Sequence, residues 1–470
     1  MIWKFAERIS ARLVSFLVSI ILARILIPED YSVVAIVTIF FSFSEVIISG
    51  GFSSALIQKK NSDDLDFSSV LFMTLSVSAI FYFALFFATG WIASAYNNDL
   101  LVPVIRVMGL VLFINSYKSV LCAFISSRLE FRKFFMSTIG GTVFSAIVGI
   151  TMALKGFGPW ALVAQEMSNS FIDTLILSIS TRYRPLMKCS YERLKSLFRF
   201  GGKIYLSSII TVVYDQIKPL IVGLRFSATD LAYYNKGESF PVLLNSSITD
   251  TFSSVLFPVI SKLQDNLDEV RNATRRFLRV SSYVIFPMMI GLFVIADNMV
   301  IVLLTEKWLP IVPYIRIFCF SYMLNIVQIG NLQAIKAIGR SDVILRLEII
   351  KKVSYLAIIL MFVLFSDSPV MLAMSTVVTT IVASFVNTFP NRKLIGYRYR
   401  QQVMDLLPNL ISSLIMGALV YAVGRISIDG FAIIALQILT GVVVYIVISL
   451  ISRNSNLAYV LDIIKGLFKR

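Results

Sequence analysis

Long apolar runs separated by short polar breaks dominate the chain. Runs of about twenty apolar residues, the length that crosses a bilayer as a helix, recur about fourteen times. The predicted spans are 9–29, 31–54, 67–93, 101–126, 135–155, 158–181, 201–224, 227–256, 280–304, 309–336, 344–366, 368–390, 404–424 and 430–452. This pattern predicts an all-α polytopic membrane protein.

The longest break between spans divides the chain into two similar halves. Within residues 182–200, apolar Leu194, Leu197 and Phe198 are interleaved with cations, which is typical of an amphipathic helix at a membrane interface. Six spans precede this break and eight follow it, so two pseudo-symmetric bundles would share one orientation in the membrane. The predicted organisation is an N-terminal six-helix bundle (1–181), a cytoplasmic amphipathic linker (182–200), a second six-helix bundle (201–391), and two extra helices with a cytoplasmic tail (392–470).

Polar side chains recur at steps of three and four in four of the spans, so each set shares one helical face. In the second half these are Ser208, Thr211, Asp215 and Lys218, then Glu238, Asn245 and Thr249 beside Lys236. Weaker versions occur 200 residues earlier, with Arg8, Arg12, Ser15 and Ser19, then Thr38, Ser42, Glu45 and Ser49. A polar helical face would be unfavourable against lipid, because its side chains would lose their hydrogen bonds to water. We expect the four faces to line one polar cavity, and structural ion pairing of the charges remains the alternative.

Composition and charge agree with a membrane protein. Hydrophobic residues make up 57% and charged residues 15% of the chain, against about half and a quarter in soluble domains. The net charge of +16 would suggest nucleic acid binding in a soluble protein, but here the cations gather in alternate loops. By the positive-inside rule this predicts that both termini are cytoplasmic, and we expect no nucleic acid partner.

The chain has no histidine and three cysteines, Cys122, Cys189 and Cys319. Imidazole catalysis and histidine metal sites are therefore excluded, and a disulfide framework or metal site is not expected. No sizeable outer loop could carry the catalytic residues of a membrane enzyme, so we expect a protein that is not an enzyme.

The cations on the polar faces favour an anionic ligand, of which phosphate and pyrophosphate are the usual biological examples. The candidate substrate-binding residues are Arg8, Arg12, Arg24, Lys218, Lys236 and Asn245. The candidates for a coupling H⁺ or Na⁺ are Asp215, Glu238 and Glu45, and no other cofactor is expected.

Other charges and rings inside the spans are open to more than one interpretation. Glu166 and Asp173, seven residues apart in the sixth span, fit a coupling-ion site and a structural pair equally well. Lys118 is expected to extend towards the interface. Trp308 lies at a predicted outer helix end, where an indole ring suits the headgroup layer.

Several short runs resemble bacterial polysaccharide export proteins. They are 23–30 (ARILIPED), 55–59 (ALIQK), 156–163 (GFGPWALV), 257–258 (FP), 307–308 (KW) and 338–340 (IGR). Their order and spacing are similar to those of the O-antigen and exopolysaccharide flippases in the multidrug/oligosaccharidyl-lipid/polysaccharide exporter superfamily. One departure is Ser32, where such sequences commonly have glycine.

The resemblance implies two six-helix bundles plus two helices in the bacterial cytoplasmic membrane, with a cavity lined by the first, second, seventh and eighth helices. It also implies a substrate of undecaprenyl pyrophosphate carrying an oligosaccharide repeat, for lipopolysaccharide or exopolysaccharide synthesis. We therefore expect a flippase that works by alternating access, with lipid-linked oligosaccharide, membrane lipids and other polysaccharide-synthesis proteins as partners. The alternatives are a drug or organic-cation antiporter of the same superfamily, which the lysines disfavour, and a non-transporting scaffold of the synthesis machinery.

Overall fold

The computed structural model is helical and contains no strand in the residues that it describes. Described are residues 2–49, 56, 62–128, 130–181, 183, 185–186, 188–426, 430–454 and 456–457. Within these ranges the description leaves out the side chains of 2–10, 47, 49, 196, 198–204, 247, 250–255, 257–259 and 341. The chain forms two compact units, Met1–Ala232 and Tyr233–Arg470.

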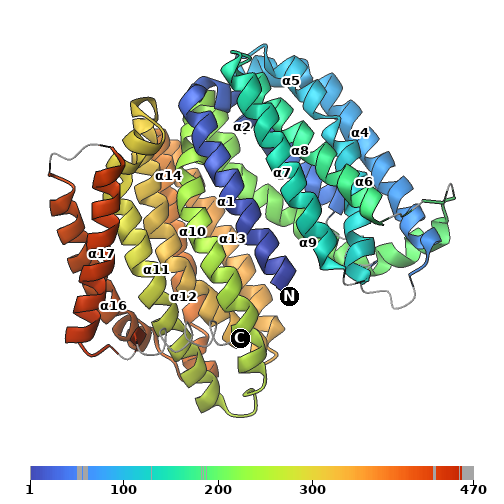
Figure 1. The fold of residues 1–470 in the computed structure, drawn as a ribbon. Helices are drawn as coiled ribbons and strands as arrows, with labels where there is room; N and C mark the ends of the chain where they lie inside the picture. The colour runs from blue at the N-terminus through green and yellow to red at the C-terminus, as the bar shows by residue number, and fades with distance from the viewer. Residues whose placement is uncertain are drawn as a thin grey trace. The chain divides into compact units, whose positions relative to one another are not determined.

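In the part of unit 1 that the structure describes there are eight helices and the start of a ninth (Figure 1). They are α1 (Ile2–Ile25), α2 (Pro28–Ser49), α4 (Asp64–Tyr96), α5 (Leu101–Met108), α6 (Val111–Ser127), α7 (Phe131–Leu154), α8 (Pro159–Thr181) and α9 (Tyr191–Arg225). Unit 2 contains most of α10 (Ala228–Ser261), then α11 (Leu267–Leu303), η1 (Glu306–Ile311), α12 (Val312–Ala337), α13 (Ser341–Phe365), α14 (Pro369–Thr388), α15 (Asn391–Leu394), α16 (Tyr399–Val423) and α17 (Phe431–Ile451).

The apolar runs correspond closely to these helices. Nine helical segments in the described part of the chain are long and apolar enough to cross a membrane. The predicted span 101–126 is broken between α5 and α6 around Gly109, and the total of fourteen spans stays a prediction. The expected linker helix is not separate, because residues 191–200 are continuous with α9, which is 35 residues long.

The segment before α9 is fixed to the start of α4 by polar contacts within unit 1. Arg193 of α9 places Nη1 2.6 Å from Oδ1 of Asp63, and the Tyr183 hydroxyl lies 3.2 Å from Oγ of Ser68. Asp63 caps α4, because its Oδ1 also accepts a hydrogen bond from the backbone N–H of Asp66. That bond and the Arg193 guanidinium lower the pKa of Asp63. The contacts hold α9's first turn against α4.

A ridge of small residues brings α7 and α8 into close contact (Figure 1). Its members are buried and recur every four residues, namely Ser137, Gly141, Ser145, Gly149 and Ala153. A Cβ atom on Gly141 would lie 2.9 Å from Cβ of Asp173, and one on Gly149 would lie 3.0 Å from Cβ of Gln165. Small residues at such spacing let membrane helices approach and gain van der Waals contact. The ridge therefore sets the position of α8 and of its acidic face.

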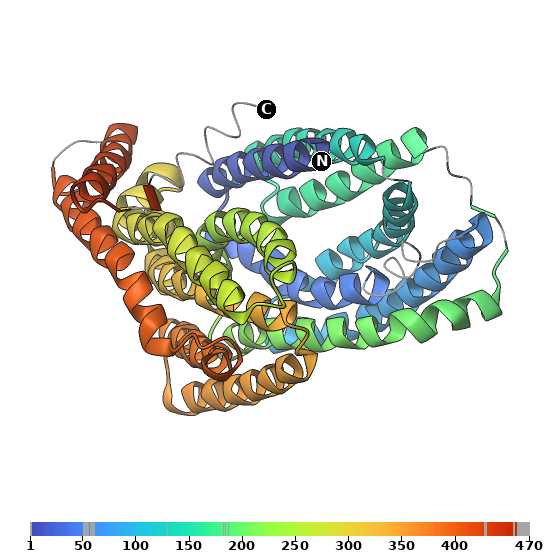
Figure 2. The ribbon, with the colours of Figure 1, turned by 90° about the horizontal axis from the view of Figure 1, so that it is seen from below.

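Unit 2 is organised around α11, which packs against α12, α16 and α17 (Figure 2). A buried amide network joins neighbouring helices to this core. Asn331 of α12 donates to Oε1 of Gln402 in α16 at 2.8 Å and accepts from Nε2 of the same residue at 2.9 Å. Asn391 of α15 also donates to Oδ1 of Asn331, at 2.6 Å. Since lipid offers no hydrogen bonds, such pairing links helices that would otherwise have only dispersion contacts.

Candidate functional site

A close approach between α10 and α12 fixes two of the candidate residues in unit 2. A Cβ atom on Gly237 would lie 2.5 Å from Cβ of Tyr314 and 3.1 Å from the carbonyl oxygen of Ile311. Any other residue at position 237 would therefore separate the helices. Lys236 and Glu238 flank this glycine, so the contact between α10 and α12 determines the directions of their side chains.

Lys236 is buried against aromatic rings. Its side chain is 7% exposed, and its Nζ lies 5.8 Å from the centroid of Trp308. Trp308 is itself fully buried and meets Tyr233 edge to face, with centroids 6.2 Å apart. Helix η1 thus places the ring inside the protein, against α10, and its depth relative to the headgroup layer stays a prediction. A ring face under an ammonium group offsets part of the cost of removing that charge from water.

Glu238 has a different partner from that of Lys236. Its Oε1 accepts a hydrogen bond from the hydroxyl of Tyr322 in α12, at 2.8 Å. Two residues apart on one helix, Lys236 and Glu238 point in different directions, as their spacing predicts. Lys236 is thus buried, whereas Glu238 is half-buried and held by Tyr322.

Asn245 lies two turns further along α10. It is 4% exposed, and its side-chain oxygen has no hydrogen-bond partner in the described part of the chain. An unsatisfied buried carbonyl group costs free energy that a bound hydroxyl group would recover. Asn245 therefore fits the predicted role in substrate binding.

The candidates in unit 1 differ widely in burial. Lys218 of α9 is 4% exposed, whereas Asp215 on the same helix is exposed. On α1, Arg12 is half-buried and Arg24 is exposed, and all four residues make polar or electrostatic contacts. The side chain of Arg8 lies outside the described residues. Their joint role on one substrate stays a prediction.

A charged cluster in unit 1 adds Lys118 and Glu45 to Glu166 and Asp173, the two carboxylates that the sequence had already linked. Lys118 of α6 places its Nζ 2.6 Å from Oδ2 of Asp173 in α8. Glu166, also on α8, interacts electrostatically with Lys118 and with Glu45 of α2. The prediction that Lys118 extends to the interface is wrong, because its ammonium group pairs with a buried carboxylate. We call Glu45, Lys118, Glu166 and Asp173 the unit 1 cluster.

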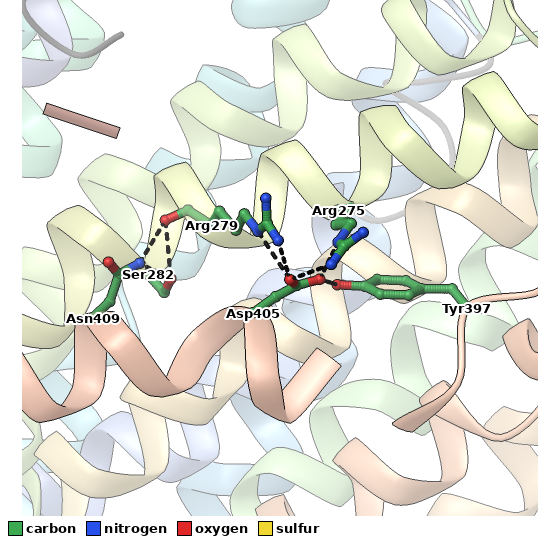
Figure 3. A network of polar contacts seen from close by, with 6 residues as sticks. All are labelled: Arg275, Arg279, Ser282, Tyr397, Asp405 and Asn409. Carbon is green, nitrogen blue, oxygen red and sulfur yellow. Dashed lines mark hydrogen bonds and ion pairs between the residues drawn. The ribbon is translucent and has the colours of Figure 1, made fainter. Parts of the chain in front are cut away.

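A second group of charges, in unit 2, serves a structural purpose. Figure 3 shows Arg275, Arg279 and Tyr397 converging on the carboxylate of Asp405. Arg275 donates from Nε at 2.5 Å and from Nη2 at 2.8 Å, Tyr397 donates its hydroxyl at 2.8 Å, and Arg279 donates two further bonds. Asp405 is 2% exposed in its side chain, and these bonds occupy its acceptor positions. The network therefore ties α16 to α11 and leaves no room for a ligand at Asp405.

The sequence contained a partial signal for this network. Arg275 and Arg279 are one turn apart and share a face of α11, whereas Asp405 is an acidic residue at the start of a predicted span. The positive-inside rule accounts for the two arginines equally well, so the pattern alone did not favour a contact.

Comparison with known proteins identifies the family. The family described as polysaccharide biosynthesis protein matches residues 21–313, which is more than half of the chain. The chain belongs to this family. The expected membership in the polysaccharide exporters is therefore confirmed.

Other members of the polysaccharide biosynthesis family are similar over most of their length. The lipopolysaccharide biosynthesis protein WzxC of Escherichia coli (strain K12) is 25% identical over 416 residues, 84% of this chain and 82% of WzxC. The succinoglycan biosynthesis transport protein ExoT of Rhizobium meliloti (strain 1021) is 24% identical over 319 residues, 68% of this chain and 65% of ExoT.

The fold is shared with a solved transporter structure. The lipid II flippase MurJ, in an inward closed conformation, superposes with a TM-score of 0.78 at 15% identity, covering 96% of this chain and 99% of MurJ. The all-helical transporter fold and the multi-pass membrane character are thus confirmed, and the relatives named above act in polysaccharide biosynthesis and transport.

Proposed function

We propose that this protein moves an oligosaccharide linked to undecaprenyl pyrophosphate from the cytoplasmic to the outer leaflet of the bacterial cytoplasmic membrane. The relatives support transport in polysaccharide biosynthesis, and the lipid-linked substrate is the part that we add. On this proposal the two units work by alternating access, and both termini are cytoplasmic.

The buried lysine of α10 is the observation that carries the proposal. Lys236 is held in a protein interior by Trp308 and by the close helix contact at Gly237. An ammonium group in a protein interior attracts anionic groups more strongly than one in water, and a pyrophosphate group is an anion suited to it. Asn245, with its unsatisfied oxygen on the same helix, is suited to a sugar hydroxyl group.

The proposal includes coupling of transport to a cation, H⁺ or Na⁺. Glu238, Asp215 and Glu45 are the candidate carboxylates for this role. Glu238 is the neighbour of Lys236 in sequence and is held by Tyr322, so its charge state can respond to the filling of the substrate site.

The test is surface polysaccharide in a strain that lacks the corresponding gene, normalised to the amount of protein in the membrane. Lys236→Gln should insert normally and lower surface polymer at least tenfold, because the anion loses its partner. Lys236→Arg should retain part of the activity, because the charge remains and the geometry changes. The matched control is Lys155→Gln, on an exposed loop, which should export polymer as the wild type does. Normal polymer from Lys236→Gln would show that the pyrophosphate group is held elsewhere.

A further inference from the structure

An apolar cavity opens on the surface of unit 2, where α11 contacts both α12 and α16. Its volume is about 540 Å³, within the range of about 300–1,000 Å³ that is usual for sites of small ligands. The lining residues are hydrophobic apart from the hydroxyl group of Tyr421. Three of them, Phe293, Phe320 and Leu414, are exposed, so the cavity is open to the surroundings of the unit. All three helices are long and apolar enough to cross a membrane, so these surroundings are hydrocarbon chains.

The cavity has the length of one membrane leaflet. Along α16 its lining runs from Leu410, near the middle of the helix, to Tyr421, near its end. At a rise of about 1.5 Å per residue these two positions are about 16 Å apart. Half of the hydrocarbon core of a bilayer is about 15 Å thick. An acyl chain of one leaflet therefore matches the cavity in length, whereas a polyprenyl chain longer than a leaflet would project from it.

The helices α11 and α16 run in the same direction along the cavity. The Asp405 network joins α16 near its start to α11 near its start, through Arg275 and Arg279. Further along both helices, a Cβ atom on Gly417 would lie 2.7 Å from Cγ2 of Ile290. The later parts of α11 and α16 therefore meet at one end of the cavity, which the predicted orientation makes the outer end.

Two arginines cover aromatic rings at this end. The guanidinium of Arg316 lies over the ring of Phe293, 5.5 Å from its centroid. That of Arg425, just after α16, lies over the ring of Tyr421, 5.0 Å from its centroid. Both rings line the cavity, so a positively charged group borders it on the side of α12 and on the side of α16.

These arginines keep hydrogen-bonding capacity for a ligand. Arg316 forms an ion pair with Asp297 and donates from Nε to the carbonyl oxygen of Phe293 at 3.4 Å. Arg425 donates from Nη2 to the hydroxyl oxygen of Tyr421, a bond that leaves its charge in place. Each guanidinium group has five N–H donors, so each retains donors for a phosphate oxygen. Two arginines and one aspartate give these three groups a net charge of +1, which one phosphodiester group balances.

From these contacts we infer that the cavity binds one acyl chain of an anionic membrane phospholipid, whose phosphate group is held by Arg316 and Arg425. The apolar lining alone would not select this lipid, because lipid tails are as apolar as the lining itself. The selection comes from the arginines, since planar guanidinium groups match phosphate oxygens and basic pockets between membrane helices attract anionic headgroups. The site is separate from Lys236 of α10 and goes beyond the proposed transport function. A lipid bound there contacts α11, α12 and α16 together and so stabilises unit 2.

The direct test is native mass spectrometry of the purified full-length chain in detergent. The chain is titrated with dioleoyl phosphatidylglycerol or with dioleoyl phosphatidylcholine, two lipids that have the same tails and differ in headgroup charge. We expect one phosphatidylglycerol molecule to bind about fivefold more tightly than phosphatidylcholine, because only its headgroup is anionic. The double variant Arg316→Gln and Arg425→Gln should lose this preference. Ala418→Phe should weaken binding of both lipids about tenfold, because Ala418 is exposed in the cavity wall and a phenyl ring there fills the space.

The matched controls carry the same substitutions away from the cavity. Arg106→Gln removes a guanidinium that lies over a ring in unit 1, 4.2 Å from the centroid of Phe86, and Ala435→Phe adds a ring to an exposed position of α17. Both controls should bind the two lipids as the wild type does.

Three results would each overturn the inference, namely equal affinities of the wild type for the two lipids, an unchanged preference in the double arginine variant, and normal binding by Ala418→Phe. Displacement of phosphatidylglycerol by an equal concentration of undecaprenyl phosphate would also overturn it, because the cavity would then hold the polyprenyl carrier. Binding is measured on the purified chain, whereas surface polymer is scored in the deletion strain. Failure of the wild type to restore polymer would therefore refute the proposed function alone.

Discussion

The Asp405 network allows a quantitative prediction about stability. The substitution Asp405→Ala removes the acceptor of five hydrogen bonds from Arg275, Arg279 and Tyr397. Breaking a buried ion pair from one side costs about 3–5 kcal/mol. Here the side chains of Arg275 and Arg279 are 43% and 41% exposed, so water can rehydrate them and the lower end of that range applies. We expect a loss of about 3 kcal/mol, which for a unit of this size lowers Tm by about 6–12 °C.

A buried cysteine provides the assay. Cys319 on α12 is 1% exposed, so a thiol-reactive fluorogenic dye reaches it only when unit 2 opens. With Cys122 and Cys189 replaced by serine, heating the detergent-solubilised chain with the dye reports the unfolding of unit 2 alone.

The matched control is a similar pair at the surface. Arg340 and Asp342 form two bonds of 2.9 Å, but both side chains are 49% exposed. Exposed pairs contribute about 0–1 kcal/mol, so Asp342→Ala should melt close to the wild type. If Asp405→Ala melts as close to the wild type as this control does, the network does not stabilise unit 2 and the reasoning is refuted.

Two further predictions concern packing and topology. Gly141→Leu should force α7 away from α8 and reduce the monodisperse fraction in size-exclusion chromatography. The control Gly90→Leu should leave that fraction unchanged, since a Cβ atom there meets nothing within 4 Å. Equal elution profiles for the two variants would contradict the role of the ridge in helix packing. In an otherwise cysteine-free chain, a cysteine at Asn98 should react with an impermeant thiol reagent from outside and one at Ser190 should not, and the reverse result would invert the predicted orientation.

Much of the fold could be predicted from the sequence because one physical term dominates it. A bilayer requires long apolar helices, so their existence can be read from hydropathy alone. Helix continuity was harder to predict. The break at 182–200 appeared to separate a linker from a span, but no proline interrupts residues 191–218, and α9 runs through Gly201 and Gly202 without ending. The energy cost of two glycines in a helix is small enough for packing to override it.

The candidate site could be predicted only in part. The stripe on α10 singled out Glu238, with Lys236 beside it, because a charge facing lipid is costly. The structure buries Lys236 and gives Glu238 a tyrosine partner, while their role in binding stays a prediction. Their partners Trp308 and Tyr322 lie far along the chain, and periodicity within one helix carries no information about them. The same limit applies to Lys118, whose long side chain can reach either the interface or Asp173. Only the tertiary arrangement decides between the two.

The small-residue ridge of α7 also bears on how the protein is made. The two helices that it joins are consecutive in synthesis and connected by a short turn in which Gly156 and Gly158 adopt positive φ angles of 79° and 55°. Closing so short a loop costs little entropy, so α7 and α8 are expected to pair soon after they leave the translocation machinery. Lys118 enters the membrane earlier in synthesis, and its partner Asp173 arrives only with this hairpin. A bulky residue on the ridge would therefore delay the pairing of this lysine with its partner, and cellular quality control would lower the amount of the chain in the membrane.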